Sequence, residues 1–259
     1  MKSTAVESGG IRAVSRAFRV LRAFTPGRMS MGVAELVRET GLPRTTVLRL
    51  VETLAAEDVL EFGGDGQIRV GTRMIGLAAF AAAAWEVPDK SLQRMRELAA
   101  ETGETVSLYV RKGLRRVVVG QAPSPNTLRH VVQPGDELPL SAGAAAYVLL
   151  GLEPKADREA LVERVIAQAG SAAGEILQSR VEAAIADGWA ISHGHREPGN
   201  TGLAVPIRSG SDRPLGRPAV LALGGPTVRF TEDKIPGFVA AARGCADDLA
   251  RTGLPPALY

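Results

Sequence analysis

Cysteine and long apolar runs are scarce in this 259-residue chain. The one cysteine, Cys245, excludes an internal disulfide and a cysteine-based metal site, and we expect it to be a small buried side chain. The longest apolar stretch, Met74 to Trp85, has 12 residues, whereas a membrane-spanning helix needs about 20. No transmembrane helix is expected. The first ten residues lack the apolar core of a secretory signal, which predicts a cytoplasmic protein.

Positive charge is concentrated near the N-terminus, although the net charge of the chain is only +3. Residues 1–75 hold 11 basic and 8 acidic side chains, whereas residues 76–259 hold 20 of each. Only five of the basic residues are lysine, and arginine is the better side chain for bidentate contact with phosphate and guanine. The charge alone fits either a nucleic-acid-binding domain or an ordinary surface.

The N-terminal pattern begins with two short helices. Apolar residues at helical spacing predict the buried face of a first helix: Val14, Ala17, Phe18, Leu21 and Phe24. A second helix is predicted from Val33 to Thr40. The tripeptide Gly41-Leu42-Pro43 then predicts a tight turn, because glycine can end one helix in the left-handed conformation and proline fits the first turn of the next.

A third helix is predicted from Pro43 to about Glu57. Its apolar face is expected to consist of Val47, Leu50, Val51 and Leu54. A recognition helix enters the major groove by its N-terminal end, where arginine can pair with guanine and small threonines allow close approach. We therefore predict that DNA is bound by Arg44, Thr45, Thr46 and Arg49. The alternative is a helical bundle with an ordinary polar face.

A β-hairpin is predicted after the third helix. Alternating apolar residues around Leu60–Phe62 and Ile68–Val70 flank a glycine-rich tip. Three helices followed by a hairpin make a winged helix, and the wing would place Gln67, Arg69 and Arg73 near the sugar-phosphate backbone or minor groove. The tip is not interpreted as a phosphate-binding loop, because it lies between two strands rather than between a strand and a helix.

Several of these stretches resemble the IclR family of bacterial regulators. They are Ala13 to Phe24 (AVSRAFRVLRAF), Thr40 to Leu54 (TGLPRTTVLRLVETL) and Ile68 to Leu77 (IRVGTRMIGL), with weaker matches at Gly135 to Leu150, Asp187 to Pro206 and Leu221 to Pro226. The resemblance covers nearly the whole chain. It implies an α+β protein, with a winged helix-turn-helix in residues 12–73 and a mixed α/β effector-binding domain, related to GAF-type sensor folds, in residues 89–253.

The function implied by this resemblance is regulation of transcription. The protein is expected to bind double-stranded operator DNA and a small-molecule effector, with no enzymatic activity, cofactor or membrane partner. The family also implies a dimer, often a dimer of dimers, joined by a helix in residues 74–88. Independently, the stretch Met74 to Trp85 is too apolar for a solvated helix, so it is expected to pack against a partner or, alternatively, against its own effector domain. Residues 1–11 and 254–259 are expected to be tails.

The pattern after Pro88 alternates between helices and strands, which favours an α+β domain. Strands are expected at 106–111, 116–121, 128–133, 190–192, 203–207 and 219–223. Helices are expected at 92–100, 141–152, 158–169, 181–187 and 233–251.

An effector pocket follows from the resemblance alone. Its residues would be Ser141, Ala142, Gly143, Ala144, Ala146, Ser192, Gly202, Ala204, Ala222 and Gly224. The family commonly has PLHATAAGKA where this chain has PLSAGAAAYV from Pro139, so Ser141, Ala146 and Tyr147 replace histidine, glycine and lysine. The small residues predict a larger or more apolar effector than a two- or three-carbon acid.

Three alternatives remain open from the residues. The run His193, His195 and Glu197 could bind a metal if its side chains share one face of a strand, although a turn-rich segment is more often solvated surface. An enzyme could use Ser141 or Ser192 with His193, but no acid or oxyanion loop stands at a recognisable spacing. A dimeric adaptor that does not bind DNA predicts an acidic or neutral third helix, which Arg44 and Arg49 disfavour.

Overall fold

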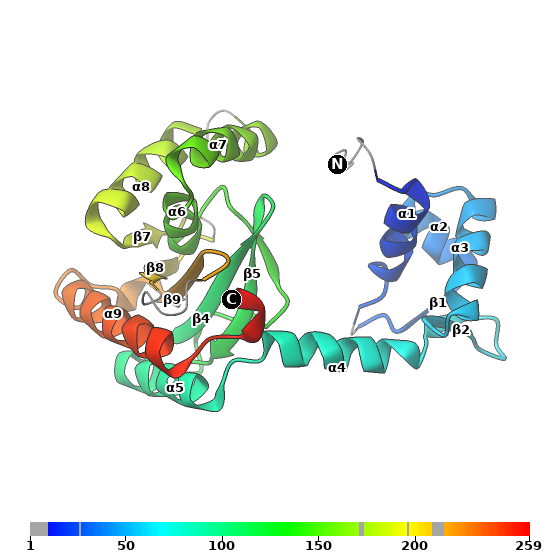
Figure 1. Cartoon of the computed structure of the whole chain (residues 1–259), viewed down its shortest axis with the longest axis horizontal. Helices are drawn as coiled ribbons and strands as arrows, with labels where there is room; N and C mark the ends of the chain where they lie inside the picture. Colours follow the sequence, from blue (N-terminus) through cyan, green and yellow to red (C-terminus); the bar gives the residue numbers. More distant parts are fainter. Residues whose placement is uncertain (1–9, 26, 171–173, 196, 209–214) are drawn as a thin grey trace. The chain divides into compact units, whose positions relative to one another are not determined.

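The computed structural model describes residues 10–259 apart from Pro26, 171–173, Arg196 and 209–214. Contacts divide the chain into an N-terminal unit, residues 1–83, and a C-terminal unit, residues 84–259 (Figure 1). The boundary falls inside the predicted linker segment 74–88. Nearly all of the predicted N-terminal tail, residues 1–11, lies outside the described residues. Helices accompany an antiparallel sheet in each unit, so the predicted α+β class is confirmed.

The N-terminal unit contains three helices and a small sheet. The helices are α1 (Arg12–Leu21), α2 (Val33–Thr40) and α3 (Arg44–Ala56), and the strands are β1 (Ser30–Met31), β2 (Leu60–Phe62) and β3 (Ile68–Val70). Helix α2 ends at Gly41, whose φ of 64° is the left-handed conformation that favours glycine. Pro43 is the N-cap residue of α3. The predicted turn between the two helices is therefore present.

Helix α1 buries only part of the predicted face: Leu21 and Phe24 pack against the core and Ala17 is half-buried. Val20 is fully buried, whereas Val14 and Phe18 are 50% and 55% exposed. Ala17, Val20, Leu21 and Phe24 also follow helical spacing. Two overlapping apolar stripes therefore existed in the sequence, and packing against α2 and α3 selects between them.

Strand β1 was not predicted, whereas the hairpin was. β2 and β3 pair antiparallel, with Leu60 opposite Val70 and Phe62 opposite Ile68. β1 adds to the other edge of β3, giving the order β1-β3-β2. A strand of two residues is too short for a periodic signal, which explains the omission.

Helix α4 (Arg73–Trp85) follows the wing and is apolar along nearly its whole length. None of its residues is buried. Ile75, Leu77 and Phe80 are 71%, 51% and 77% exposed. Among the described residues, no helix is long and apolar enough to cross a membrane.

A six-stranded antiparallel sheet forms the centre of the C-terminal unit, in the order β6-β5-β4-β9-β8-β7. The strands are β4 (Thr105–Lys112), β5 (Arg115–Ala122), β6 (Glu137–Pro139), β7 (Ala190–His193), β8 (Asn200–Ile207) and β9 (Ala219–Pro226). Helices α5 (Asp89–Thr102) and α9 (Ile235–Thr252) cover one face, and α6 (Ala144–Gly151), α7 (Lys155–Ala169) and α8 (Gly174–Asp187) lie over the other (Figure 1).

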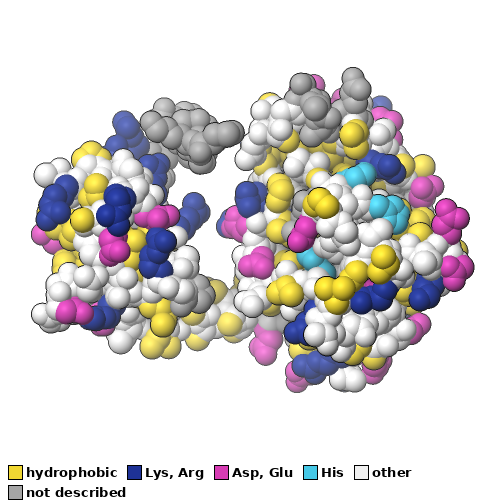
Figure 2. Space-filling view, turned by 180° about the vertical axis from the view of Figure 1, so that it is seen from behind, with side chains coloured by type: hydrophobic (Ala, Val, Ile, Leu, Met, Phe, Trp, Pro, Cys, Tyr) yellow, Lys and Arg dark blue, Asp and Glu magenta, His cyan; other side chains and the backbone are white. Residues whose placement is uncertain are grey.

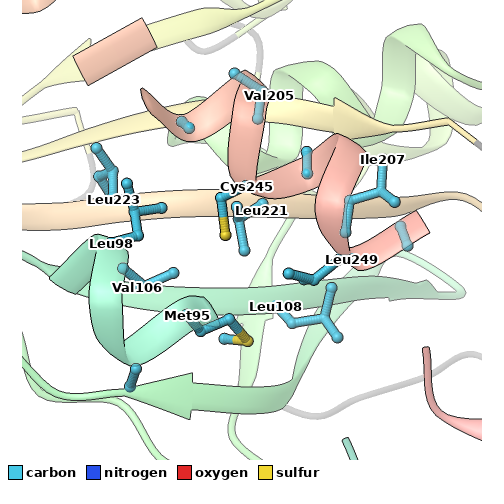
Figure 3. Close-up of a cluster of buried hydrophobic side chains, with 14 of the residues drawn as sticks. Met95, Leu98, Val106, Leu108, Val205, Ile207, Leu221, Leu223, Cys245 and Leu249 are labelled. Atoms are coloured by element: carbon cyan, nitrogen blue, oxygen red, sulfur yellow. The ribbon is translucent and has the colours of Figure 1, made fainter. Parts of the chain in front are cut away.

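Alternation along the central strands divides the unit into two cores. On β4, Val106 and Leu108 face α5 and α9, whereas Ser107 and Tyr109 face the side of α6. The labelled side chains of the first core lie between these two helices and the sheet (Figure 3). Cys245 is one of them, fully buried as expected, and its burial raises the pKa of the thiol to about 12. This thiol is therefore shielded from reagents in the folded chain.

Three element predictions for the C-terminal unit are wrong or too short. Residues 128–133 form a loop rather than a strand, and the strand β6 begins at Glu137. Helix α8 begins at Gly174, seven residues before the predicted start at Val181. The expected C-terminal tail, residues 254–259, is packed: Leu254 and Leu258 are 3% and 0% exposed and belong to the core beside α9. Burial of these leucines holds the segment on the domain.

Candidate functional site

Helix α3 exposes basic and hydroxyl side chains along its N-terminal half. Val47 and Val51 are fully buried against the other helices. Arg44, Thr45 and Arg49 are exposed, and Thr46 is half-buried. The four predicted DNA-binding residues of this helix therefore lie at its N-terminal half, with three of them open to solvent. Lys and Arg side chains are visible at several places on the N-terminal unit in Figure 2.

The wing holds one of its predicted DNA-binding arginines in an ion pair. Arg69 donates from Nη2 to Asp65 at 2.6 Å, and its guanidinium occupies the space that a side chain at Gly63 would need, 1.7 Å from the ideal Cβ position. Asp65 also accepts from the backbone N–H of Gln67, and this bond followed by Arg69 lowers the pKa of the carboxyl. Gln67 is half-buried, and Arg73 is exposed at the start of α4. The sequence did not predict that Asp65 is the partner of Arg69.

A cavity of about 50 Å³ lies in the C-terminal unit between the start of α6 and the sheet. It is lined by Ser107, Tyr109, Arg116, His130, Gly143, Ala144, Ala145, Ser192, Glu197, Asn200, Thr201, Gly202, Ala222, Leu223 and Gly224. Six predicted effector residues are brought together here: Gly143, Ala144, Ser192, Gly202, Ala222 and Gly224. The structure thus gathers residues separated by about 80 positions at one site.

The other predicted effector residues do not line the cavity. Ala146 and Ala204 are fully buried in the apolar core on this face of the sheet. Ser141 and Ala142 are half-buried in the loop before α6, and the carbonyl of Ala142 accepts a hydrogen bond from Arg116.

Sequence reasoning missed the polar residues that β4, β5 and the loop after β5 contribute. Arg116 on β5 is 3% exposed and donates from Nη1 to the carbonyls of Pro139 and Ala142. Its guanidinium also lies over the ring of Tyr109, 5.7 Å from the centroid. The lining is therefore more polar than the small residues of the predicted set suggested. The sequence did contain a signal: Arg116 stands at a position where the alternation of β5 buries the side chain, and a charged residue is rarely buried without a partner.

The glycine at position 224 does not leave open space. The ring of His130 fills it, since an ideal Cβ on Gly224 would lie 2.9 Å from that ring. The imidazole Nδ1 is hydrogen-bonded to Asn200 Nδ2 at 2.9 Å, and Thr105 Oγ1 donates to the His130 carbonyl at 2.9 Å. Histidine side chains and exposed apolar side chains appear on the face of the C-terminal unit seen in Figure 2.

The H-x-H-x-E run does not converge on one point. His193 Nδ1 pairs with Thr201 Oγ1 at 3.0 Å, and His195 Nδ1 pairs with the buried hydroxyl of Tyr147 at 2.8 Å. Strand β7 ends at His193, so His195 does not continue its alternation. In the part of the chain that the structure describes, no three His, Cys, Asp or Glu residues are grouped as metal ligands. The metal alternative gains no support from this geometry.

Two family models match the chain and together span most of it. Residues 13–63 match the IclR helix-turn-helix domain, and residues 80–251 match the model described as bacterial transcriptional regulator IclR C-terminal. The chain belongs to the IclR family. This IclR-family protein is a DNA-binding transcriptional regulator, as the sequence predicts.

Individual IclR-family proteins are similar over most or all of their length. A crystal structure of an IclR-family regulator from Rhodococcus sp. is 38% identical, covers 100% of both chains and has a TM-score of 0.61. The regulator KipR of Bacillus subtilis is 26% identical over 86% of this chain and 89% of its own. An IclR homolog from Microbacterium hydrocarbonoxydans, solved with 4-hydroxybenzoate, is 24% identical, covers 93% of this chain and all of that one, and has a TM-score of 0.70.

Proposed function

We propose that α3 is the recognition helix and that Arg44, Thr45, Thr46 and Arg49 contact the operator in the major groove. The observation that carries this proposal is the exposure of Arg44, Thr45 and Arg49 in the N-terminal half of α3, whereas Val47 and Val51 are buried. Arginine can donate two hydrogen bonds to guanine, and threonine is small enough for close approach to a base edge or phosphate. Gln67, Arg69 and Arg73 would contact the backbone beside it.

We propose that the cavity of the C-terminal unit binds a small-molecule effector that changes operator affinity. Its polar lining under the start of α6 supports binding, and the homolog solved with 4-hydroxybenzoate shows one ligand of a family member. We also propose that the ligand is bound rather than chemically changed. Ser192 and His193 are consecutive on β7, so their side chains point to opposite faces of the sheet and cannot act as nucleophile and base.

We propose that the protein acts as a homodimer in the cytoplasm, with α4 at the dimer interface and domains at residues 12–73 and 89–253. Helix α4 exposes Ile75, Leu77 and Phe80, which is costly in water unless a partner covers them. A two-fold dimer would present two copies of α3 to a pseudo-palindromic operator.

Mobility shift on the DNA upstream of the protein's own gene tests the recognition helix. Arg44→Ala and Arg49→Ala should each weaken specific binding by about 1–3 kcal/mol, the value of a lost bidentate base contact. Arg164→Ala on α7 is the control, because it removes the same charge from an exposed site of the other unit. Wild-type affinity in both α3 variants would remove these residues from the interface.

A further inference from the structure

Helix α1 and its C-cap carry a row of four arginines at the surface of the N-terminal unit. Arg12, Arg19 and Arg22 are exposed, and Arg16 is half-buried. We propose that this arginine row binds phosphates of the operator duplex, as a second DNA contact beside the recognition helix. The inference goes beyond the proposed recognition helix, and it rests only on DNA binding by the N-terminal unit.

The arginine row has the spacing of a linear contact. Its members follow one another at intervals of three and four residues, and side chains at this spacing are neighbours on a helix surface. Arg12 and Arg19 are two turns apart, which is a rise of about 10 Å along the helix. One strand of B-DNA carries a phosphate about every 3.4 Å of the duplex axis. The helical part of the row is therefore long enough to follow about three phosphates of one strand.

No carboxylate neutralises the arginine row within the part of the chain that the structure describes. Helix α1 contains three arginines and no aspartate or glutamate. None of the four guanidiniums forms an ion pair or a side-chain hydrogen bond with another described residue. Helices α5, α7 and α9 differ, because each of them carries at least two acidic side chains among its basic ones. Their charges are balanced locally, whereas those of α1 are not.

The arrangement is unfavourable for the helix by itself. Arg12 and Arg16 are like charges four residues apart, which destabilises a helix. Arg12 also lies in the first turn, where the helix dipole disfavours a cation, and the N-cap Ile11 supplies no side-chain hydrogen bond. A bound polyanion would offset both effects. This argument from helix electrostatics is independent of the missing ion pairs, and it also indicates an external anion.

The place of the arginine row in the fold favours DNA as the polyanion. Residues 13–63 match the IclR helix-turn-helix domain, so all members of the row except the first lie in the matched segment. Helix α1 packs on α3, and Val20 of α1 belongs to the same buried cluster as Val51 of α3. This shared core holds the row at a fixed distance from Arg44 and Arg49, as a second contact to the same duplex requires.

The contact should add affinity without adding sequence preference. Phosphates look alike in every sequence, so arginines that bind them position the protein and do not read bases. The arginine row should therefore strengthen binding to operator and unrelated DNA by the same factor. Its contribution should decrease as salt rises, because each phosphate contact releases counterions.

Arg12→Gln/Arg19→Gln tests the proposal on the full-length protein. Both side chains are exposed, and glutamine keeps a high helix propensity while it removes the charge. Fluorescence anisotropy over a salt series measures binding to a duplex of unrelated sequence and to the DNA upstream of the protein's own gene. The slope of log affinity against log salt should fall by about one unit for each arginine in each bound subunit. Affinity at about 0.1 M salt should fall by about tenfold or more for both duplexes.

Arg164→Gln/Arg180→Gln is the matched control. It removes two exposed arginines from α7 and α8 of the C-terminal unit, so the change in net charge is the same. This control should keep the wild-type salt slope. If thermal unfolding shows that Arg12→Gln/Arg19→Gln does not fold, Arg22→Gln carries the test, because Arg22 is exposed and lies outside the helix at its C-cap. It should lower the slope by about one unit in each bound subunit.

Several results would overturn the proposal. They are a wild-type salt slope in the folded α1 variant, an equal loss in the control, a loss confined to the upstream DNA, and no binding of unrelated DNA by the wild type at low salt. Sedimentation without DNA tests a protein partner: a changed oligomeric state of the α1 variant would assign the arginine row to a subunit contact instead.

Failure of the recognition helix is a separate outcome. Wild-type affinity of Arg44→Ala and Arg49→Ala for the upstream DNA would refute the assignment of α3, while the effect of the α1 variant on unrelated DNA would still stand. A normal salt slope in the α1 variant, together with weakened specific binding in the α3 variants, would refute the arginine row and leave the recognition helix intact.

Discussion

Arg229 donates from Nε and Nη2 to the two carboxylate oxygens of Glu104, at 2.6 and 2.8 Å. Glu104 is fully buried before β4, and the same Nη2 also donates to the carbonyl of Leu128. The ion pair therefore ties the start of the central strand to the end of β9 and to the loop that carries His130. It positions one wall of the cavity beside α6, which His130 lines.

Removing the arginine should leave a buried carboxylate without its cation. Arg229→Met is expected to lower the free energy of unfolding by about 3–5 kcal/mol, because an uncompensated buried charge is strongly destabilising. The double variant Glu104→Gln/Arg229→Met should recover part of this loss, since it removes the charge as well. Urea denaturation of the wild type and the two variants measures both values. A single variant as stable as wild type would show that the pair contributes nothing.

Gly225 has a packing role beside this ion pair. An ideal Cβ at this position would lie 1.8 Å from Glu104 Oε2, and the bidentate pairing leaves that carboxylate no room to turn away. Gly225→Ala should destabilise the protein by about 3 kcal/mol. Gly244→Ala on α9 is the control: nothing lies within 4 Å of its Cβ, so the change should stabilise the helix by about 0.5–1 kcal/mol. Equal unfolding midpoints for the two alanine variants would contradict the close contact.

The pair Asp65 and Arg69 gives a prediction for the wing. If Arg69 contacts a phosphate, Arg69→Ala should lower affinity for all DNA sequences alike and reduce the slope of log affinity against log salt by about one unit. Asp65→Asn should raise non-specific affinity, because it removes a negative charge and releases the guanidinium from its 2.6 Å ion pair. Salt titrations on operator and unrelated DNA measure both effects. A loss confined to the operator would instead assign Arg69 to base reading.

His195 should titrate below its ordinary range. Burial, followed by the charges of Arg180 and His193, lowers the pKa of His195 from 6.5. As the pH falls, the unfolded chain takes up the proton on His195 before the folded chain does. The free energy of unfolding therefore decreases as the pH passes the pKa of the unfolded state, and it stops decreasing below the pKa of the folded state. An NMR titration should give a value below 6.5, and Arg180→Gln should raise it. His195→Gln should remove this part of the pH dependence of unfolding, and an unchanged profile would exclude His195 as its source.

Local signals in the sequence predicted the winged helix well. The Gly41-Leu42-Pro43 turn is decided by backbone conformations that only these residue types favour, so no distant contact is needed to predict it. The buried face of α1 was predicted only in part, because Val14 and Val20 both lie on apolar stripes with helical spacing and only Val20 is buried. Only the tertiary packing against α3 distinguishes them.

The pocket was less predictable, because its walls come from distant parts of the chain. The family resemblance predicted six of its residues. Arg116 and Ser107 lie on strands that were predicted from the sequence, but the pattern did not indicate that these two side chains line a pocket. Their side chains face the cavity because of sheet register, which pairs Ser107 with Ala222. His130 lies in a loop that was predicted as a strand, and it is held there by Asn200 and Thr105. Such contacts have no local sequence signature.

Helix α4 gives the last prediction, which concerns assembly. If Leu77 and Phe80 are covered in a dimer, Leu77→Glu or Phe80→Glu would bury an unpaired carboxylate at the interface, so sedimentation should show monomers at concentrations where the wild type is dimeric. Operator affinity should fall as well, because two linked recognition helices bind more tightly than one.

Ala160→Glu adds the same charge to an exposed site on α7 and should change neither measurement. Ligand binding to the C-terminal cavity should survive in all three variants, because none of these residues lines it. A dimer that persists in both α4 variants would place the subunit contact elsewhere, and the exposed apolar face of α4 would then need another partner.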